Sequence, residues 1–126
     1  MTENEIARAV FWSGLKVHRT LGPGLLESVY ETCLCFELEK TGLLVEKQKP
    51  LPLIYEGVQL DAGFRIDLFV ENKFVIEIKS VASLTDIHMA QILTYLKLSN
   101  CKLGMLINFN TYLFKDGVRR VICGKI

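Results

Sequence analysis

Residues 64–80 read Phe-Arg-Ile-Asp-Leu-Phe-Val-Glu-Asn-Lys-Phe-Val-Ile-Glu-Ile-Lys-Ser and contain two strand-like segments, 64–70 and 74–80. β-Branched and aromatic residues dominate both segments, and the polar residues 71–73 between them are typical of a turn. The pattern predicts a β-hairpin in which Val70 lies opposite Phe74.

The side chains of the two predicted strands divide into two faces, because successive residues of a strand point to opposite sides of the sheet. One face is uniformly apolar and is expected to pack on a helix; it holds Ile66, Leu68, Val70, Phe74, Ile76 and Ile78. The other face carries Arg65, Asp67, Glu77 and Lys79 among apolar neighbours. Ionisable groups thus project from the middle of two hydrophobic strands.

The hairpin register brings two carboxylates together. An odd-length turn places Asp67 directly opposite Glu77, with Cβ atoms about 5 Å apart. Two bare carboxylates at that distance repel each other, and Mg²⁺ or Mn²⁺ removes the conflict because these ions prefer hard oxygen ligands. The alternative is an exposed ion pair on a solvated face of the sheet, either Asp67 with Arg65 or Glu77 with Lys79. The residues alone leave both interpretations open.

The rest of the chain predicts helices on both sides of this hairpin. Thr2 and Glu5 form a capping box for a helix over 3–19, and a second helix covers 25–41 after a Gly-Pro-Gly break. A strand with two prolines over 49–57 suits a sheet edge. Ser83 or Thr85 caps a helix over 86–98, and strands follow at 102–108 and 118–123. The order ααβββαβ, with a final strand, predicts one α/β domain over 1–126, a mixed β-sheet flanked by helices.

Composition and charge limit the classes of function that the protein can have. Half of the 126 residues are hydrophobic and 23% are charged, which is ordinary for a globular protein. No apolar run reaches the length of about 18 residues that a membrane span needs, so we expect a soluble, cytoplasmic protein with no membrane partner. Residues 1–80 carry 9 Lys and Arg against 12 Asp and Glu, and residues 81–126 carry 6 against 2. A nucleic-acid function therefore needs a local basic patch, a metal or a dimer.

Five motifs in order resemble those of the PD-(D/E)XK nuclease superfamily, and within it the small bacterial group called GxxExxxR proteins. They are Leu21–Tyr30, Arg65–Asp67, Glu77–Lys79, His88–Tyr95 and Gly104–Asn110. The similarity runs from about Val17 to Val121 and implies a restriction-endonuclease-like core. Two positions depart from the pattern: Ile66 replaces the proline of the superfamily's name, and Glu31 stands where the group's name places an arginine.

The resemblance implies a role for each matching residue. Asp67 and Glu77 would bind Mg²⁺ or Mn²⁺, with the backbone carbonyl of Ile78 as a further ligand. Lys79 would orient or activate the attacking water, and Glu27 would complete the acidic cluster. The metal would act as a Lewis acid and generate a hydroxide nucleophile. Glu27 also falls in the first turn of a helix, where a carboxylate is favoured whatever the function.

The predicted helix over 86–98 carries a polar stripe. Gln91 and Tyr95 are four residues apart, and His88 lies three residues before Gln91, so all three share one helix face. In related nucleases a Gln-x3-Tyr motif supports the site, which makes Gln91, Tyr95 and His88 candidates for contacting the metal ligands. The alternative is a solvated helix face. We expect His18 to be a surface residue.

Two functions follow from these features. The first is a Mg²⁺-dependent nuclease that hydrolyses DNA or RNA. The alternative is a catalytically inactive nuclease-fold module for binding or assembly, since fold does not imply function; a Lys79–Asp67 ion pair in the site would favour it. A structure with Asp67 and Glu77 on opposite faces of the sheet would eliminate the nuclease hypothesis altogether.

Because so small a chain cannot surround a duplex, we also expect a homodimer that uses the first helix or the C-terminal strand.

Overall fold

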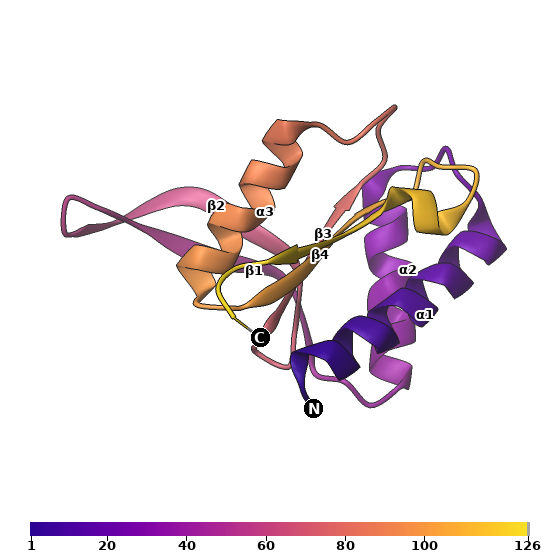
Figure 1. Ribbon diagram of the computed structural model, residues 1–126, viewed down its shortest axis with the longest axis horizontal. Helices are drawn as coiled ribbons and strands as arrows, with labels where there is room; N and C mark the ends of the chain where they lie inside the picture. Colours follow the sequence, from indigo (N-terminus) through magenta and orange to yellow (C-terminus); the bar gives the residue numbers. More distant parts are fainter. Residues whose placement is uncertain (126) are drawn as a thin grey trace.

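The computed structural model describes residues 1–125 and has a five-stranded mixed sheet between two helical layers (Figure 1). The strand order is β1-β2-β3-β4-β5; β3 and β4 are parallel and the other neighbours are antiparallel. The elements are α1 (Glu3–Leu21), α2 (Glu27–Lys40), β1 (Val45–Tyr55), β2 (Val58–Val70), β3 (Phe74–Lys79), α3 (Asp86–Ser99), β4 (Leu103–Asn108), a 3-10 turn (Phe114–Gly117) and β5 (Val118–Ile122). The predicted α/β class and element order are confirmed.

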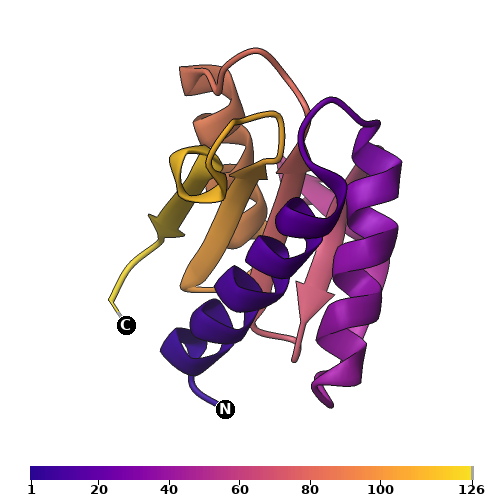
Figure 2. The same cartoon turned by 90° about the vertical axis from the view of Figure 1, so that its right-hand side faces the viewer.

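The helices divide between the two faces of the sheet. Figure 2 shows α1 and α2 on one face and α3 on the other. Two apolar cores result: one between the sheet and α1 and α2, the other between the sheet and α3. All six residues of β4 are buried, as expected for a central strand. Within residues 1–125, no helix is both long and apolar enough to cross a membrane.

The N-terminal helices begin and end for local reasons. The capping box of α1 is present: the Glu5 N–H donates to Thr2 Oγ1 (3.2 Å), and the Thr2 N–H donates to Glu5 Oε1 (3.0 Å). Gly22 ends the helix with a φ of 72°. His18 is buried, and its Nε2 lies 2.8 Å from the carbonyl of Thr111, to which it donates. The expectation of a surface histidine was wrong, because the loop after β4 folds back over α1.

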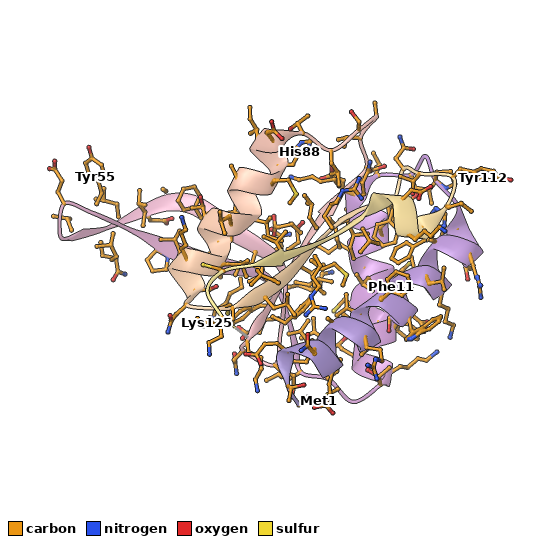
Figure 3. All side chains as sticks on the ribbon, viewed as in Figure 1. Met1, Phe11, Tyr55, His88, Tyr112 and Lys125 are labelled. Carbon is orange, nitrogen blue, oxygen red and sulfur yellow. The ribbon has the colours of Figure 1, made fainter. Side chains whose placement is uncertain are left out.

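Strand β1 lies at the edge of the sheet, as its prolines predicted. It pairs with β2 over a longer span than the sequence suggested, from Val45 to Tyr55. The far half of this hairpin projects past α3 as an arm (Figure 1), with Tyr55 near its tip (Figure 3). Four large apolar side chains of the arm are exposed: Ile54, Tyr55, Val58 and Leu60.

The regular alternation of β2 breaks at Asp67. Leu68 and Val70 pack in the core beside α1 and α2, as predicted, but Ile66 packs in the core beside α3. The prediction that Ile66 shares their face was wrong. Pairing of β2 with β3 ends at Leu68 opposite Ile76, so β2 separates from β3 at this level and changes face.

Candidate metal centre

The β2–β3 hairpin holds two carboxylates against each other. Val70 lies opposite Phe74, the predicted register. Beyond the last strand pair, the Asp67 N–H donates to Glu77 Oε2 (2.9 Å) and the Ile78 N–H donates to Asp67 Oδ2 (2.7 Å). Each carboxylate thus accepts a bond that a strand carbonyl would otherwise accept. Asp67 and Glu77 are therefore in contact where the two strands separate.

Burial makes this contact electrostatically costly. The Glu77 residue is 3% exposed, and desolvation, followed by the charge of Asp67, raises its pKa to about 8. Desolvation also raises the pKa of Asp67, although the bond from Ile78 opposes the shift. Two such groups cannot both ionise cheaply without a cation. The alternative of an exposed Glu77–Lys79 pair on a solvated face is wrong, because Glu77 is buried.

Lys79 lies close to these carboxylates without an ion pair. Its charge lowers the pKa values of Asp67 and Glu77 in part. The ion pairs found within residues 1–125 join Lys16 and Lys40 to Glu37, and Lys49 to Glu46. None involves Lys79, so the Lys79–Asp67 pair expected of a retired site does not form.

A stacked tyrosine fixes the start of α2 beside the hairpin. Tyr30 is fully buried, and its ring stacks on Phe109 with centroids 4.5 Å apart. Its hydroxyl donates to the Gly22 carbonyl (2.6 Å) and accepts from the Leu25 N–H (3.1 Å). Gly24 in the same loop has a φ of 95°, which favours glycine. These contacts set where α2 begins, and hence where Glu27 lies.

Glu27 bridges α2 to the end of β3. Its Oε2 accepts from the Ser80 N–H (3.1 Å), and the Ser80 hydroxyl donates to the Leu25 carbonyl (2.6 Å). An open hollow of about 270 Å³ lies here, lined by Glu27, Ser28, Glu31, Gln48, Asp67 and Ile78. Its size is below the usual range of about 300–1,000 Å³ for drug-sized ligands, so it suits an ion and a phosphate group better than an enclosed metabolite.

The oxygen atoms around the hollow have the chemistry that a divalent cation needs. Within residues 1–125, no three His, Cys, Asp or Glu side chains converge as a cation cluster, so Glu27 does not join Asp67 and Glu77 in one. The Ile78 N–H points to Asp67, and the carbonyl of the same strand residue faces the same edge. Asp67 and Ile78 line the hollow, and the buried Glu77 accepts a bond from the Asp67 N–H. The two carboxylates, both of raised pKa, and the backbone carbonyl form an oxygen-only set, which fits Mg²⁺ or Mn²⁺.

Helix α3 approaches the carboxylates from the other face of the sheet. Tyr95 is buried, the Gln91 Nε2 donates to its hydroxyl (3.2 Å), and burial together with the charge of Glu77 raises its pKa. Tyr95 therefore belongs to the site's surroundings and not to a solvated helix face. His88 has a different contact: its Nδ1 accepts from the Thr85 N–H (3.1 Å) at the start of α3. Thr85, one of the two predicted caps, is the N-cap.

A family model described as the PD-(D/E)XK nuclease superfamily matches residues 4–121. The chain belongs to this superfamily. No curated protein and no solved structure matches it. The five-stranded mixed sheet with three helices is consistent with the PD-(D/E)XK nuclease fold. Membership links the chain to nucleases as a class and carries the general expectation of divalent-metal chemistry on nucleic acid.

Two residues near the site of this superfamily member were not predicted. Asn108 is 2% exposed; its Oδ1 accepts from the Val81 N–H (3.1 Å) and its Nδ2 donates to the Val81 carbonyl (3.0 Å), which fixes the segment after β3. In the sequence, Asn108 is a polar residue at the end of the apolar run 103–107, and this position could have marked it as a site residue. Gln48 donates from Nε2 to Glu31 and to Asp67 Oδ1 (3.2 Å). No sequence signal marked it, since glutamine is ordinary on an exposed strand.

Proposed function

We propose that this protein is a divalent-metal-dependent nuclease that hydrolyses phosphodiester bonds of DNA or RNA. The single observation behind the proposal is the contact of Asp67 with the buried Glu77, whose carboxylate accepts from the Asp67 N–H; the pKa values of both carboxylates are raised. Such an arrangement costs stability unless a cation compensates it. Membership of a nuclease superfamily supports the same activity.

Each residue of the site has a proposed role. Asp67, Glu77 and the Ile78 carbonyl would hold Mg²⁺ or Mn²⁺, and Glu27 at the rim of the hollow would add negative charge without joining the ligand set. A bound divalent ion supplies Lewis-acid polarisation of the phosphate and lowers the pKa of coordinated water. Lys79 lies two residues beyond Glu77 and has no ion-pair partner in residues 1–125. Its ammonium is therefore available to donate to a phosphate oxygen or to orient water.

Helix α3 supports these groups from behind. Tyr95 lies near enough to Glu77 for the charge of that carboxylate to raise the Tyr95 pKa, and Gln91 donates to the Tyr95 hydroxyl. We propose that the pair shields Glu77 from solvent on that side. We propose no direct substrate contact for either residue.

We further propose that the chain belongs to the GxxExxxR group, on the strength of Gly24 and Glu27, with Glu31 in place of the arginine.

The second candidate is an inactive binding or assembly module on the same fold. One observation favours it: Glu31 places a further carboxylate in the hollow, where a phosphate would approach, and burial raises its pKa. A site that repels phosphate would have lost its substrate even if it kept the cation. Metal binding without cleavage would be the expected behaviour of such a module.

Metal titration into the wild type and Glu77→Ala distinguishes these functions. We expect Mg²⁺ and Mn²⁺ to bind the wild type by calorimetry, with affinity reduced at least about 10-fold in the variant, because a ligand of the cation is gone. Mixed DNA and RNA incubated with the loaded wild type should be cleaved. Glu56→Gln is the matched control, since Glu56 is exposed on the arm. Metal binding without cleavage favours the inactive module, and no binding at millimolar metal contradicts a metal site.

We also propose that two copies form a homodimer in the cytoplasm. The outer edge of β5 has no neighbouring strand in the sheet within residues 1–125. Beside it lies an open groove of about 600 Å³ whose lining includes Trp12, Met105 and Val118. Trp12 is 61% exposed, which is unusual for so large an apolar side chain. Trp12 and the open strand edge together suit a second copy of this chain.

Sedimentation velocity tests the dimer. The wild type is expected to sediment as a dimer at micromolar concentration, and Trp12→Ala as a monomer, because the large apolar contact would be lost. Trp12 lines the groove beside β5 and not the hollow at Asp67, so Mn²⁺ affinity should not change. A wild type that stays monomeric up to about 100 µM would rule out a dimer whose Kd lies in the micromolar range.

A further inference from the structure

Gln48 has a backbone conformation that is costly for its residue type. It lies in the middle of β1 with a φ of 52°, in the left-handed region that favours glycine. Its neighbours pair normally with β2: Lys47 with Leu68, and Lys49 with Ile66. The intervening pair, Gln48 with Asp67, is missing from the ladder. A separate register shift follows between Leu51 and Leu53, but the positive φ within β1 belongs to the residue that faces Asp67.

Burial of the Gln48 side chain does not account for this conformation. Gln48 is exposed, at the rim of the hollow, so its side chain buries no apolar surface by adopting it. What the conformation achieves is a pair of hydrogen bonds from Nε2, one to Glu31 Oε1 and one to Asp67 Oδ1. Among the described residues, five non-glycine residues have a positive φ, and Gln48 is the one that lies within a strand and not in a turn or helix cap. Backbone strain of this kind is often found at functional sites.

The Asp67 carboxylate accepts a hydrogen bond at each of its two oxygens. Oδ2 accepts from the Ile78 N–H at 2.7 Å, and Oδ1 accepts from Gln48 at 3.2 Å. Both donors are neutral, so they orient the carboxylate without cancelling its charge. A lysine or arginine here would compete with a cation for the same oxygen. Glu31 accepts the second hydrogen of the amide, which fixes the direction of the Gln48 side chain.

We propose that Gln48 is a positioning residue, whose left-handed backbone is retained because it holds the Asp67 carboxylate in the orientation that receives the divalent cation. The inference rests on the proposed function for its purpose but on the contacts above for its geometry. It also gives Glu31 a role: the carboxylate that replaces the arginine anchors the amide of Gln48.

Two substitutions of Gln48 separate the effect of its side-chain amide from the effect of its backbone conformation. Gln48→Ala and Gln48→Gly both remove the hydrogen bonds, but only glycine relieves the positive φ. We expect both to lower Mn²⁺ affinity about 5- to 20-fold, by analogy with other groups that orient metal ligands. In the absence of metal, Gln48→Gly should melt about 3 °C above Gln48→Ala. A variant that is more stable yet binds metal less well is not expected from a merely structural role.

The arm offers a matched control. Glu56, at the tip of the arm, also has a positive φ, 51°, but lies outside the hollow. Glu56→Gly should therefore melt above Glu56→Ala by a similar margin, with Mn²⁺ affinity unchanged. If the Gln48 variants bind Mn²⁺ as tightly as the wild type, the positioning role is wrong.

Metal-free crystal structures of the wild type and Gln48→Ala test the geometry apart from metal binding. We expect the Asp67 carboxylate to keep its bond to the Ile78 N–H in the wild type and to rotate away from that position in the variant. An unmoved carboxylate in the variant would overturn the inference, whatever the titrations give. A wild type that binds no Mn²⁺ but whose Asp67 moves on substitution would contradict the proposed function and leave the positioning by Gln48 supported.

Discussion

Lys79→Met is expected to slow metal-dependent phosphodiester cleavage by about 10³-fold, within the range of about 10²–10⁴ for a positioned proton donor or acceptor. Methionine is nearly as long as lysine but has no charge and no donor. Lys79 lies on the same strand as Glu77, and its charge lowers the pKa values of both Asp67 and Glu77 in part. Its loss removes the cationic group that would stabilise charge developing on the phosphate.

Metal binding should respond in a different way. A positive charge beside the carboxylates opposes a second cation, so Lys79→Met should bind Mn²⁺ as tightly as the wild type or a few-fold more tightly. Single-turnover cleavage at saturating metal, together with calorimetry, measures both properties. Lys97→Met, on the exposed side of α3, is the matched control and should leave both unchanged. Loss of metal affinity and cleavage in equal measure would mean that Lys79 maintains the fold of the site.

Glu77→Gln should stabilise the metal-free protein strongly at alkaline pH. The folded-state pKa of Glu77 is raised to about 8 from an ordinary 4.5. Between these values the folded state keeps a proton that the unfolded state has lost. The free energy of unfolding therefore falls as pH rises from about 5 to about 8 and then levels off. Because each tenfold difference in proton affinity between the two states corresponds to about 1.4 kcal/mol, the loss is on the order of 3–5 kcal/mol.

The glutamine variant lacks this titration but keeps the hydrogen bond. Its amide oxygen can still accept from the Asp67 N–H, as Glu77 Oε2 does. Urea unfolding at pH 5, 6.5 and 8 in the presence of a chelator should show the wild type losing stability and Glu77→Gln remaining nearly constant. Millimolar Mg²⁺ should restore the wild type at pH 8 and leave the variant unaffected. Equal pH dependence in the two proteins would show that Glu77 is ionised without penalty.

The parts of the fold that local sequence determines were predicted. Period-two alternation and an odd turn give the β2–β3 register, so the meeting of Asp67 and Glu77 follows from residues ten apart. The same is true of the capping box of α1, since both of its partners lie within one helical turn, and Thr85 was one of the two predicted caps of α3. Interpretation of the motifs also predicted the nuclease superfamily, which the family model confirms.

The parts that depend on distant segments were missed or wrong. The position of Gln48 depends on a local break in the β1–β2 ladder, and no propensity indicates a left-handed glutamine within a strand. The expected face of Ile66 assumed an unbroken strand, whereas the carboxylates interrupt the pairing of β2 with β3. His18 is buried by a loop 93 residues away, a contact that helix periodicity cannot reveal.

The order in which the strands pair has a consequence for how long the folded state survives. The β2–β3 hairpin closes over three residues, whereas β3 reaches β4 only through α3, with Phe74 opposite Leu103. Local pairing closes before distant pairing, because the entropy lost on loop closure is smaller. The carboxylates therefore meet early, while still hydrated, and are desolvated only when α3 and β4 dock. Because desolvation comes with the last pairing, we expect a bound cation to stabilise the folded state more than the transition state, and therefore to slow unfolding more than it speeds folding.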